Sequence, residues 1–249
     1  MDVFHQPYEK QAYHAMLAAL SGACEGETVL DAGCGAGLTL APLADAVGPS
    51  GRVYGVDALP GLLARAAEHA GNRARLIRAD LSAGLPFGQA CLDRIICNNV
   101  LECLPDKRGF LRSAMNALRP GGTLFLGHFD FDSPLAASSF PRMTRTLFHG
   151  YADEKQPWMA ASDGRMGRKL PGLLRCCGMT PVDGGTLLFA ERSLSGGYAE
   201  GLISDIRQGL TAKGFDPELA AAWYEDFEDL DRKGMFFFSI QWMYALCRA

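Results

Sequence analysis

The sequence predicts an α/β fold, in which short apolar strands alternate with helices around a mostly parallel sheet. Apolar runs of strand length recur through the first half of the chain, and helical patterns lie between them. This alternation is typical of parallel sheets, because each helix returns the chain to the edge where the next strand starts. A glycine-rich turn at residues 33–37 follows the first run, which indicates a nucleotide-type site at the carboxyl end of a strand.

The glycine-rich turn has a distinctive spacing. An apolar run at residues 28–30 ends in Asp31, and glycines follow at alternate positions, Gly33, Gly35 and Gly37. Glycine has no Cβ, so the backbone can turn tightly there and a ligand can approach it closely. A helical pattern comes next, so the turn would deliver the ligand to a helix N-terminus. Dinucleotide sites are spaced Gly-x-Gly-x-x-Gly instead, and an ordinary tight turn is the simplest alternative.

Three further predicted strands end in polar side chains. They are residues 52–56 before Asp57, residues 76–79 before Asp80 and Leu81, and residues 92–97 before Asn98. A carboxylate about 20 residues past the glycines can accept hydrogen bonds from both hydroxyls of a ribose. For each acid, a solvated carboxylate at a strand end is the alternative.

A fifth strand, residues 123–127, follows the turn Leu-Arg-Pro-Gly-Gly at residues 118–122. These five landmarks, in this order, resemble the class I S-adenosylmethionine-dependent methyltransferases, whose motif I is similar to the glycine turn. The resemblance implies a Rossmann-like, seven-stranded, mostly parallel sheet with helices on both faces, to which this chain adds a helical lid. It also implies S-adenosylmethionine as the cofactor. The cofactor-binding residues implied are Tyr13, Asp31, Gly33, Gly35, Gly37, Asp57, Ala58, Asp80, Leu81 and Asn98.

The resemblance also implies a role for several of these residues. Asp57 would bind the ribose, and Asp80 the adenine amino group, while the backbone N–H of Leu81 would meet the adenine ring. Asp31 would lie near the amino group of the methionine part. Cys34, inside the turn, is expected to be a small filler.

Composition excludes several classes of protein. The chain has 249 residues and a net charge of −4 without a basic arm, so it is not expected to bind nucleic acid. It has no apolar stretch near 18 residues and no signal-peptide pattern, so no membrane association is expected. Its eight cysteines form no Cys-x-x-Cys pair, which favours a reduced, cytoplasmic protein without a metal site.

The chain is expected to form a single methyltransferase domain over residues 1–249. Its core would span residues 22–133 and its last strand residues 235–247. The remaining segments would supply lid or substrate elements, namely residues 1–21, 134–178 and 193–233. We expect the helices of residues 198–232 to pack over the open end of the sheet or against a second copy in a homodimer. A peripheral decoration is the alternative.

The segment after the fifth strand, Gly127-His128-Phe129-Asp130-Phe131-Asp132-Ser133, carries the candidate substrate residues. It is similar to the Asp-Thr-Asp-Trp-Asp-Ser sequence of a bacterial subgroup of small-molecule methyltransferases, the UbiE-like or type 11 methyltransferases. The subgroup's Gly-Arg-x-Leu-Pro segment corresponds to residues 167–171, and its Phe-Phe-Ser-x-x-x-Tyr ending to residues 237–244. The first acid of the subgroup's motif is His128 in this chain.

His128 is the candidate general base, since it lies at a strand end and an unperturbed histidine titrates near neutral pH. A hydrogen-bonded structural histidine is the alternative. Asp130 and His149 are weaker candidates for contact with the substrate. Tyr151 and Trp158 would supply apolar walls for a flat acceptor, although aromatic clusters also build cores.

These features predict methyl transfer to a small-molecule acceptor, a specialised metabolite. Arsenite methylation is one alternative, because the thiolates of Cys176 and Cys177 could bind a soft metalloid. Neighbouring residues of a helix point in different directions, however, which argues against that site. A non-catalytic cofactor-binding protein is a second alternative, and an NAD-dependent oxidoreductase is the alternative outside the family.

Overall fold

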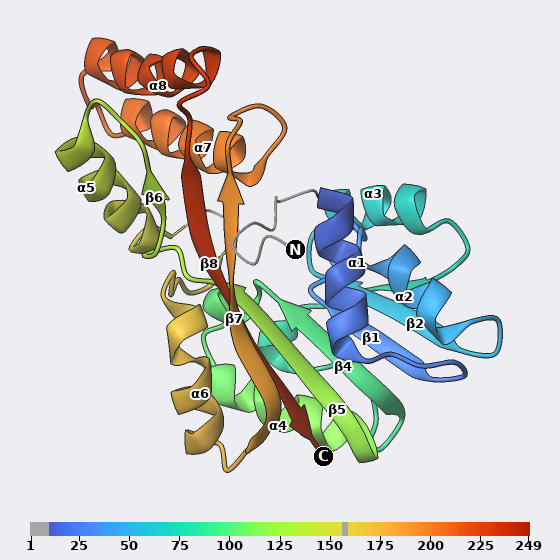
Figure 1. Cartoon of the computed structure of the whole chain (residues 1–249). Helices are drawn as coiled ribbons and strands as arrows, with labels where there is room; N and C mark the ends of the chain where they lie inside the picture. Colours follow the sequence, from blue (N-terminus) through green and yellow to red (C-terminus); the bar gives the residue numbers. More distant parts are fainter. Residues whose placement is uncertain (1–9, 156–158) are drawn as a thin grey trace.

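The computed structural model describes residues 10–155 and 159–249, and its centre is one sheet (Figure 1). The strands are β1 (Thr28–Ala32), β2 (Arg52–Asp57), β3 (Arg75–Arg78), β4 (Leu92–Asn98), β5 (Leu118–Phe129), β6 (Leu135–Ala136), β7 (Pro181–Glu191) and β8 (Phe238–Arg248). The helices are α1 (Lys10–Ser21), α2 (Leu40–Val47), α3 (Pro60–Ala70), α4 (Lys107–Ala117), α5 (Pro141–Ala152), α6 (Met166–Cys176), α7 (Tyr198–Ala212) and α8 (Pro217–Arg232). Two short 3₁₀ helices are η1 (Leu81–Ala83) and η2 (Leu101–Cys103).

The strand order is β3-β2-β1-β4-β5-β8, with β6 and β7 both paired to β8. The pairs from β3 to β5 are parallel, whereas β8 runs antiparallel to β5, β6 and β7. The expected α/β class with a mostly parallel sheet is therefore confirmed. The sheet has eight strands rather than seven, because the two-residue β6 pairs with β8 beyond the end of β5.

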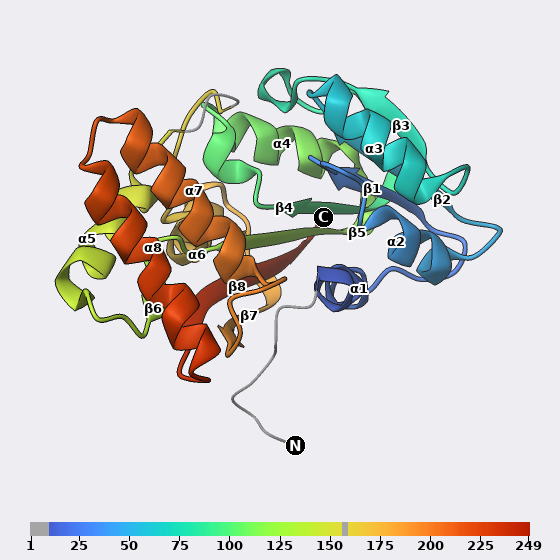
Figure 2. The ribbon, with the colours of Figure 1, turned by 90° about the horizontal axis from the view of Figure 1, so that it is seen from above.

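Helices cover both faces of the sheet, as expected (Figure 2). Buried residues of α1, α2 and α3 form a core with one face, and those of α4 and α6 form a second core with the other. The sequence of α4 shows how such a helix arises. Its buried side chains Phe110, Leu111, Ala114 and Ala117 repeat at helical spacing, and the Asp106 carboxylate caps its start by accepting from the Gly109 N–H at 2.8 Å.

A lobe of three helices, α5, α7 and α8, lies around the outer ends of β7 and β8 (Figure 1). Aromatic side chains fill its interior, among them Trp223 and Phe227 of α8 and Phe148 of α5. The Trp223 indole N–H donates to the Thr144 hydroxyl at 2.9 Å, so the polar end of this buried ring is satisfied. These residues belong to the same core as α1 and the sheet, and the lobe is therefore packed onto the fold.

Element boundaries differ from the sequence expectations at the last strand and at the fifth strand. The last strand begins at Phe238 rather than at residue 235. The turn at residues 118–122 is incorporated into β5 as an irregularity, because Leu118 pairs with Leu92 and the ladder resumes only at Thr123 with Arg94.

Within the residues that the structure describes, no helix combines the length and the apolar character needed to cross a membrane.

Candidate functional site

A cavity of about 340 Å³ lies at the carboxyl ends of β1, β2, β3 and β4. Each strand contributes the residues that directly follow it or end it, because parallel strands finish at the same edge of the sheet. We call this space the cofactor cavity. Its lining includes seven of the predicted cofactor-binding residues: Gly33, Gly35, Asp57, Ala58, Asp80, Leu81 and Asn98.

The three glycines of the loop after β1 serve different purposes. All three have a positive φ, which L side chains rarely adopt. A Cβ at Gly35 would meet nothing within 4 Å, so this residue leaves open space on the cavity side. A Cβ at Gly33 would lie 2.2 Å from Val100, and one at Gly37 would lie 2.7 Å from Ala66 of α3. Gly37 therefore allows close packing of α3 and lies outside the described lining of the cavity.

The carboxylates of Asp57 and Asp80 are oriented by backbone N–H groups. Asp57 accepts from the Gly35 N–H at 3.0 Å and from the Leu59 N–H at 2.9 Å, so it ties the glycine loop to the end of β2. Asp80 accepts from the Ser82 N–H at 2.8 Å and so starts η1. Both carboxylates line the cavity and retain acceptor capacity for a ligand, since each oxygen has two lone pairs.

Asp31 is buried beneath the loop, with 4% of its surface exposed. Burial, and secondarily the charge of Asp57, raises the pKa of Asp31 to about 7. It does not line the described cavity, so any influence on a bound cofactor would act through its charge. Such a carboxyl group would be stabilised in its charged form by a cation bound nearby.

Tyr13 of α1 also lies outside the described lining of the cavity, but it contacts a residue that belongs to it. The Tyr13 hydroxyl donates to the Asn98 side-chain oxygen at 3.1 Å, and the Trp242 indole N–H donates to the same oxygen at 3.0 Å. Asn98 is thereby fixed between α1 and β8 at the end of β4. Tyr13 supports the position of this cavity-lining amide.

Two more cavities continue from the first. The inner chamber, about 170 Å³, shares Asn99 and Cys103 with the cofactor cavity. The outer chamber, about 530 Å³, shares Tyr151 and Tyr198 with the inner chamber and is otherwise lined by the start of α7. Three neighbouring hollows therefore lie between the end of the sheet and the helical lobe.

His128 does not line any of these three cavities. It is 1% exposed, and its Nδ1 lies 2.5 Å from the backbone carbonyl of Phe129. Its Nε2 has no hydrogen-bond partner among the described residues and lies 3.6 Å from a carboxylate oxygen of Glu102. Burial lowers the pKa of His128 to about 4, so the imidazole is neutral at physiological pH.

Glu102 is a site residue that the sequence reasoning missed. It lies in η2, is 5% exposed and lines the inner chamber. Burial, and secondarily the charge of Asp163, raises the pKa of Glu102 to about 8. A carboxyl group whose pKa lies near the working pH can exchange a proton with a ligand in that chamber.

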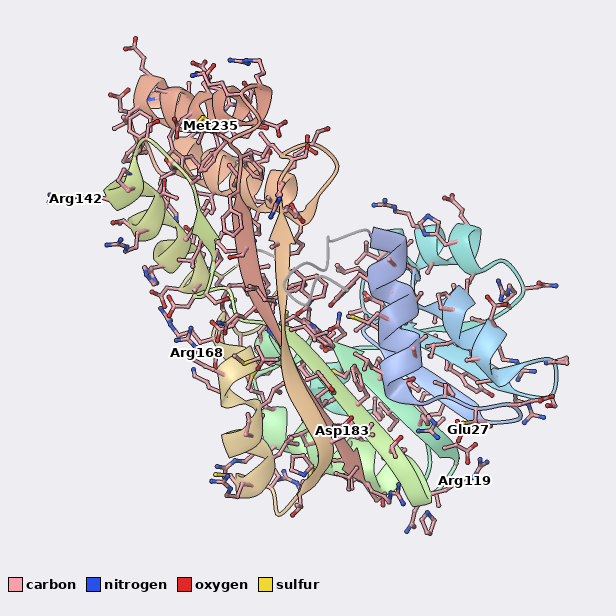
Figure 3. All side chains as sticks on the ribbon, viewed as in Figure 1. Glu27, Arg119, Arg142, Arg168, Asp183 and Met235 are labelled. Carbon is pink, nitrogen blue, oxygen red and sulfur yellow. The ribbon has the colours of Figure 1, made fainter. Side chains whose placement is uncertain are left out.

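The segment after β5 forms a network of ion pairs with the elements beside it. Asp130, with no exposed surface, binds the Arg168 guanidinium through two hydrogen bonds, of 2.5 and 2.7 Å. Asp132 pairs with His149 of α5, with Arg165 and with Arg168. Figure 3 shows Arg168 on α6 near the base of the lobe. The two sequence segments 127–133 and 167–171 therefore meet in space, and they do so through charge.

The structure separates the residues that were predicted to contact the substrate, which are Asp130, His149, Tyr151 and Trp158. Tyr151 lines both the inner and the outer chamber. Asp130 and His149 are held in the ion-pair network and line none of the three cavities. Trp158 lies outside the described residues.

Asn99 is a second residue that the sequence reasoning passed over, and the signal for it was local. It has a positive φ of 54°, which is uncommon outside glycine but tolerated by asparagine. Its side-chain oxygen accepts from the Phe129 N–H at 2.8 Å, and it lines both the cofactor cavity and the inner chamber. The feature of the sequence that could have indicated Asn99 is the pair of adjacent asparagines that follows a predicted buried strand.

The fold and the cavity define a protein that binds a nucleotide-type cofactor at the switch point of a Rossmann-like sheet. Comparison with known proteins gives the family. Residues 29–122 match a family model described as a methyltransferase domain. Residues 29–122 are accordingly identified as a class I S-adenosylmethionine-dependent methyltransferase domain, whose cofactor is S-adenosylmethionine. The alternative of an NAD-dependent oxidoreductase is not supported.

Individual relatives resemble only part of the chain. An arsenite methyltransferase of Halobacterium salinarum is 36% identical over 107 residues, which are 42% of this chain and 27% of that protein. An aklanonic acid methyltransferase of a Streptomyces species is 33% identical over 129 residues, 50% of this chain and 56% of that protein. The chain spans 27–56% of the length of the curated relatives it matches.

The likeness to solved structures extends over more of the chain. A methyltransferase from Aquifex aeolicus, described as dependent on S-adenosylmethionine, superposes with a TM-score of 0.54. It covers 94% of this chain and 88% of that one at 16% identity. This level of identity shows a common fold and says nothing about the acceptor.

Proposed function

We propose that this protein transfers the methyl group of S-adenosylmethionine to a small-molecule acceptor, a specialised metabolite. The observation that carries the proposal is the junction at Asn99 and Cys103, where the cofactor cavity meets the inner chamber. The sulfonium is already a strong electrophile, so the protein must mainly hold the acceptor in line with the methyl group. A chamber of about 170 Å³ beside the cofactor suits the reacting part of a small molecule better than a folded macromolecule.

In this proposal, each part of the cofactor is bound by a different set of the described residues. The Asp57 carboxylate binds the ribose hydroxyls, and Asp80 and the backbone of Leu81 bind the adenine ring. Gly33 and Gly35 admit the methionine part, with Asp31 supplying negative charge below it. Asn98, fixed by Tyr13 and Trp242, closes the cavity on the side of β5.

Arsenite methylation is supported less well. Of the described cavities, the cofactor cavity and the inner chamber contain one thiol, that of Cys103, while Cys176 and Cys177 lie at the far end of α6 and line neither. Burial raises the pKa of the Cys103 thiol to about 12, so it is not poised to be a thiolate ligand. The described residues also offer no group of three metal-ligating side chains.

Two measurements test the proposed function. Isothermal titration calorimetry should show that S-adenosylhomocysteine binds and that NADH does not. Incubation of the protein with methyl-labelled S-adenosylmethionine and metabolite extracts should then give an acceptor whose mass increases by one methyl group. Tight binding of S-adenosylhomocysteine without transfer to any extract would favour a non-catalytic cofactor-binding protein.

A further inference from the structure

An unusual pair of buried groups lies at the inner chamber: Glu102, which lines it, and His128, which lies behind Glu102 and outside the lining. The Phe129 carbonyl can only accept a hydrogen bond, so Nδ1 of His128 carries the proton and Nε2 presents a lone pair. That lone pair has no hydrogen-bond partner among the described residues, and the nearest acidic oxygen belongs to Glu102, 3.6 Å away. An unsatisfied buried acceptor is costly, so this arrangement calls for a donor. Protonated Glu102 is the group placed to supply one.

The surroundings of Glu102 favour its neutral form. Asp163, which precedes α6, faces it with negative charge, and Lys107 of α4 opposes that effect. Tyr151 and Glu154 from the end of α5 line the same chamber, as does the neighbouring Cys103. Glu154 is paired with Lys213, whereas Glu102 forms no ion pair with a described lysine or arginine. Glu102 is also the carboxylate next to the junction with the cofactor cavity, since Cys103 belongs to both spaces.

The described lining of the inner and outer chambers contains aromatic and acidic side chains but no positively charged ones. Phe131, Tyr151 and Tyr198 line the inner chamber, and Glu200 and Asp205 line the outer one. Among the described residues that line these two chambers there is no lysine, arginine or histidine. Aromatic faces and carboxylates both attract cations, and the same lining repels a carboxylate or phosphate group on a ligand.

We propose that the acceptor is an aromatic or apolar small molecule with a primary or secondary amine, and that Glu102 receives the proton of its ammonium group. This inference rests on the proposed function. The ammonium binds the ionised form of Glu102, which a cation at this site stabilises, and gives its proton to the carboxylate; this leaves a neutral amine and the carboxylic acid that the buried site favours. The nitrogen lone pair then forms the N–C bond as the C–S bond of the sulfonium breaks. The positive charge passes from sulfur to the methylated nitrogen, and Glu102 later releases its proton to water.

Burial explains why an amine fits this site better than a hydroxyl. Proton transfer from an ammonium to a carboxylate removes two opposite charges, which a buried site favours. Transfer from a phenol or alcohol only moves one negative charge from the carboxylate to the acceptor, so burial gives no such advantage. His128 is then a positioning residue. Its Nε2 lies 3.6 Å from a Glu102 oxygen, so an approach of a few tenths of an ångström would let it accept a hydrogen bond from protonated Glu102 and stabilise the neutral acid.

A set of three indole probes of matched shape tests the acceptor class. Tryptamine, tryptophol and indole-3-acetate carry an amine, a hydroxyl and a carboxylate on the same ring system. With methyl-tritiated S-adenosylmethionine, we expect label on tryptamine and at least tenfold less on the other two. Label on tryptophol or indole-3-acetate in preference to tryptamine, or on none of the three, would overturn the amine assignment.

The role of Glu102 is tested with Glu102→Gln, and Glu225→Gln is the matched control on an exposed part of α8. We expect Glu102→Gln to lower turnover of tryptamine by about 10²-fold or more. Its affinity for S-adenosylhomocysteine should be unchanged in calorimetry. Full turnover in this variant would disprove the role of Glu102. Failure of the wild-type protein to bind S-adenosylhomocysteine would instead count against the proposed function itself.

The positioning role of His128 is tested by the ionisation of Glu102, which can be followed by ¹³C NMR of labelled glutamate in the complex with S-adenosylhomocysteine. The Glu102 signal should titrate near pH 8. His128→Leu removes the acceptor and should move this titration to lower pH, whereas His128→Gln retains an acceptor and should restore it in part. Titration of Glu102 near pH 4 in the wild-type protein would overturn the pairing, whether or not the leucine variant folds.

Discussion

At the scale of single residues, the surroundings of each acid separate those that face a ligand from those that hold the fold. Asp57 and Asp80 keep contact with the cofactor cavity and are oriented by backbone N–H groups. Asp130 is neutralised by Arg168. Asp31 is buried and has no ion pair with a described side chain, so its ionisation depends on what binds nearby.

The Asp57 carboxylate should contribute strongly to cofactor affinity. Asp57→Ala removes the acceptor for two ribose hydroxyls and releases the Gly35 N–H that shapes the loop. We expect a loss of about 1.5–3 kcal/mol in binding of S-adenosylhomocysteine, the range for a hydrogen bond to a charged group. Calorimetry measures it, with Asp45→Ala on the exposed side of α2 as the control. Equal affinities of the two variants would refute the ribose assignment.

Asp31 should make the stability of the ligand-free protein depend on pH. Because burial raises the pKa of Asp31 from 3.8 to about 7, the folded protein favours the protonated form. Its contribution to the free energy of unfolding is therefore greatest below pH 4 and falls as the pH rises to about 7. Asp31→Asn removes this fall, so the variant should be more stable than the wild type at pH 8 by about 4 kcal/mol.

Urea unfolding at pH 5 and pH 8 measures this effect on ligand-free wild type and variant. The stabilisation of Asp31→Asn relative to wild type should be less than half as large at pH 5 as at pH 8, because the carboxyl group ionises near pH 4 in the unfolded chain and near pH 7 in the folded protein. A difference that is the same at both pH values would mean that Asp31 titrates normally despite its burial.

At the scale of elements, the segment after β5 is fastened to α6 and α5 by charge. The backbone there leaves the sheet, and Asp130 and Asp132 turn toward Arg168, Arg165 and His149. This network fixes α6 and α5 relative to the end of β5, where the wall of the inner chamber begins with Phe131. The aspartates are therefore structural supports for the chamber.

Arg168→Ala should destabilise the protein because it leaves the Asp130 carboxylate buried without its cation. We expect a loss of about 3 kcal/mol, the lower end for breaking a buried pair, since the Arg168 side chain is 45% exposed. Chemical denaturation measures the loss, and Arg142→Ala at the exposed start of α5 is the control. Adding Asp130→Asn should recover part of the stability, and no recovery would argue against the buried charge as the cause.

The sequence was most informative where an element depends on neighbours in the chain. The glycine loop and the strand ends at Asp57, Asp80 and Asn98 follow from local patterns, and all lie around one cavity. The inner chamber could not be predicted in this way, because Glu102, Tyr151 and Tyr198 are brought together by η2, α5 and α7, which are far apart in the chain.

The burial of His128 had a usable sequence signal. Side chains of a strand alternate between its faces, so His128 shares a face with Leu124 and Leu126. Both leucines pack in the core with α4 and α6, whereas Phe125 and Phe129 pack on the α1 face. The alternation of side chains along a strand therefore predicts that the His128 side chain lies on the face that packs against α4 and α6, opposite the face that α1 covers.

At the scale of the whole molecule, the strand β8 connects the cofactor half to the helical lobe. One end of β8 pairs with β5 from Phe129 to Thr123, and the other pairs with β6. Along the opposite side it pairs with β7 throughout. The chambers lie between these two parts, and the lobe helices α5 and α7 supply their outer walls.

The lobe segments should close over the acceptor. Residues 134–170 and 198–232 contain α5, α7 and α8, and parts of them line the chambers. Hydrogen exchange in these two segments should slow when S-adenosylhomocysteine and an acceptor bind together, because bound ligand suppresses local opening. Exchange measured by mass spectrometry reports it. Protection confined to residues 29–100 would favour a peripheral role for the lobe.

The pairing of β7 with β8 has a consequence for how this protein can change. Glu191 and Phe238 face each other across the ladder, so the chain that carries α7 and α8 leaves and re-enters the sheet at adjacent positions. A segment whose two ends are fixed side by side can be exchanged for another of different length without disturbing the register of β5 or the loop after β1. Under the proposed function, exchange of residues 192–237 would change the part of the chamber walls that Tyr198, Glu200 and Asp205 supply and would leave the described lining of the cofactor cavity unchanged.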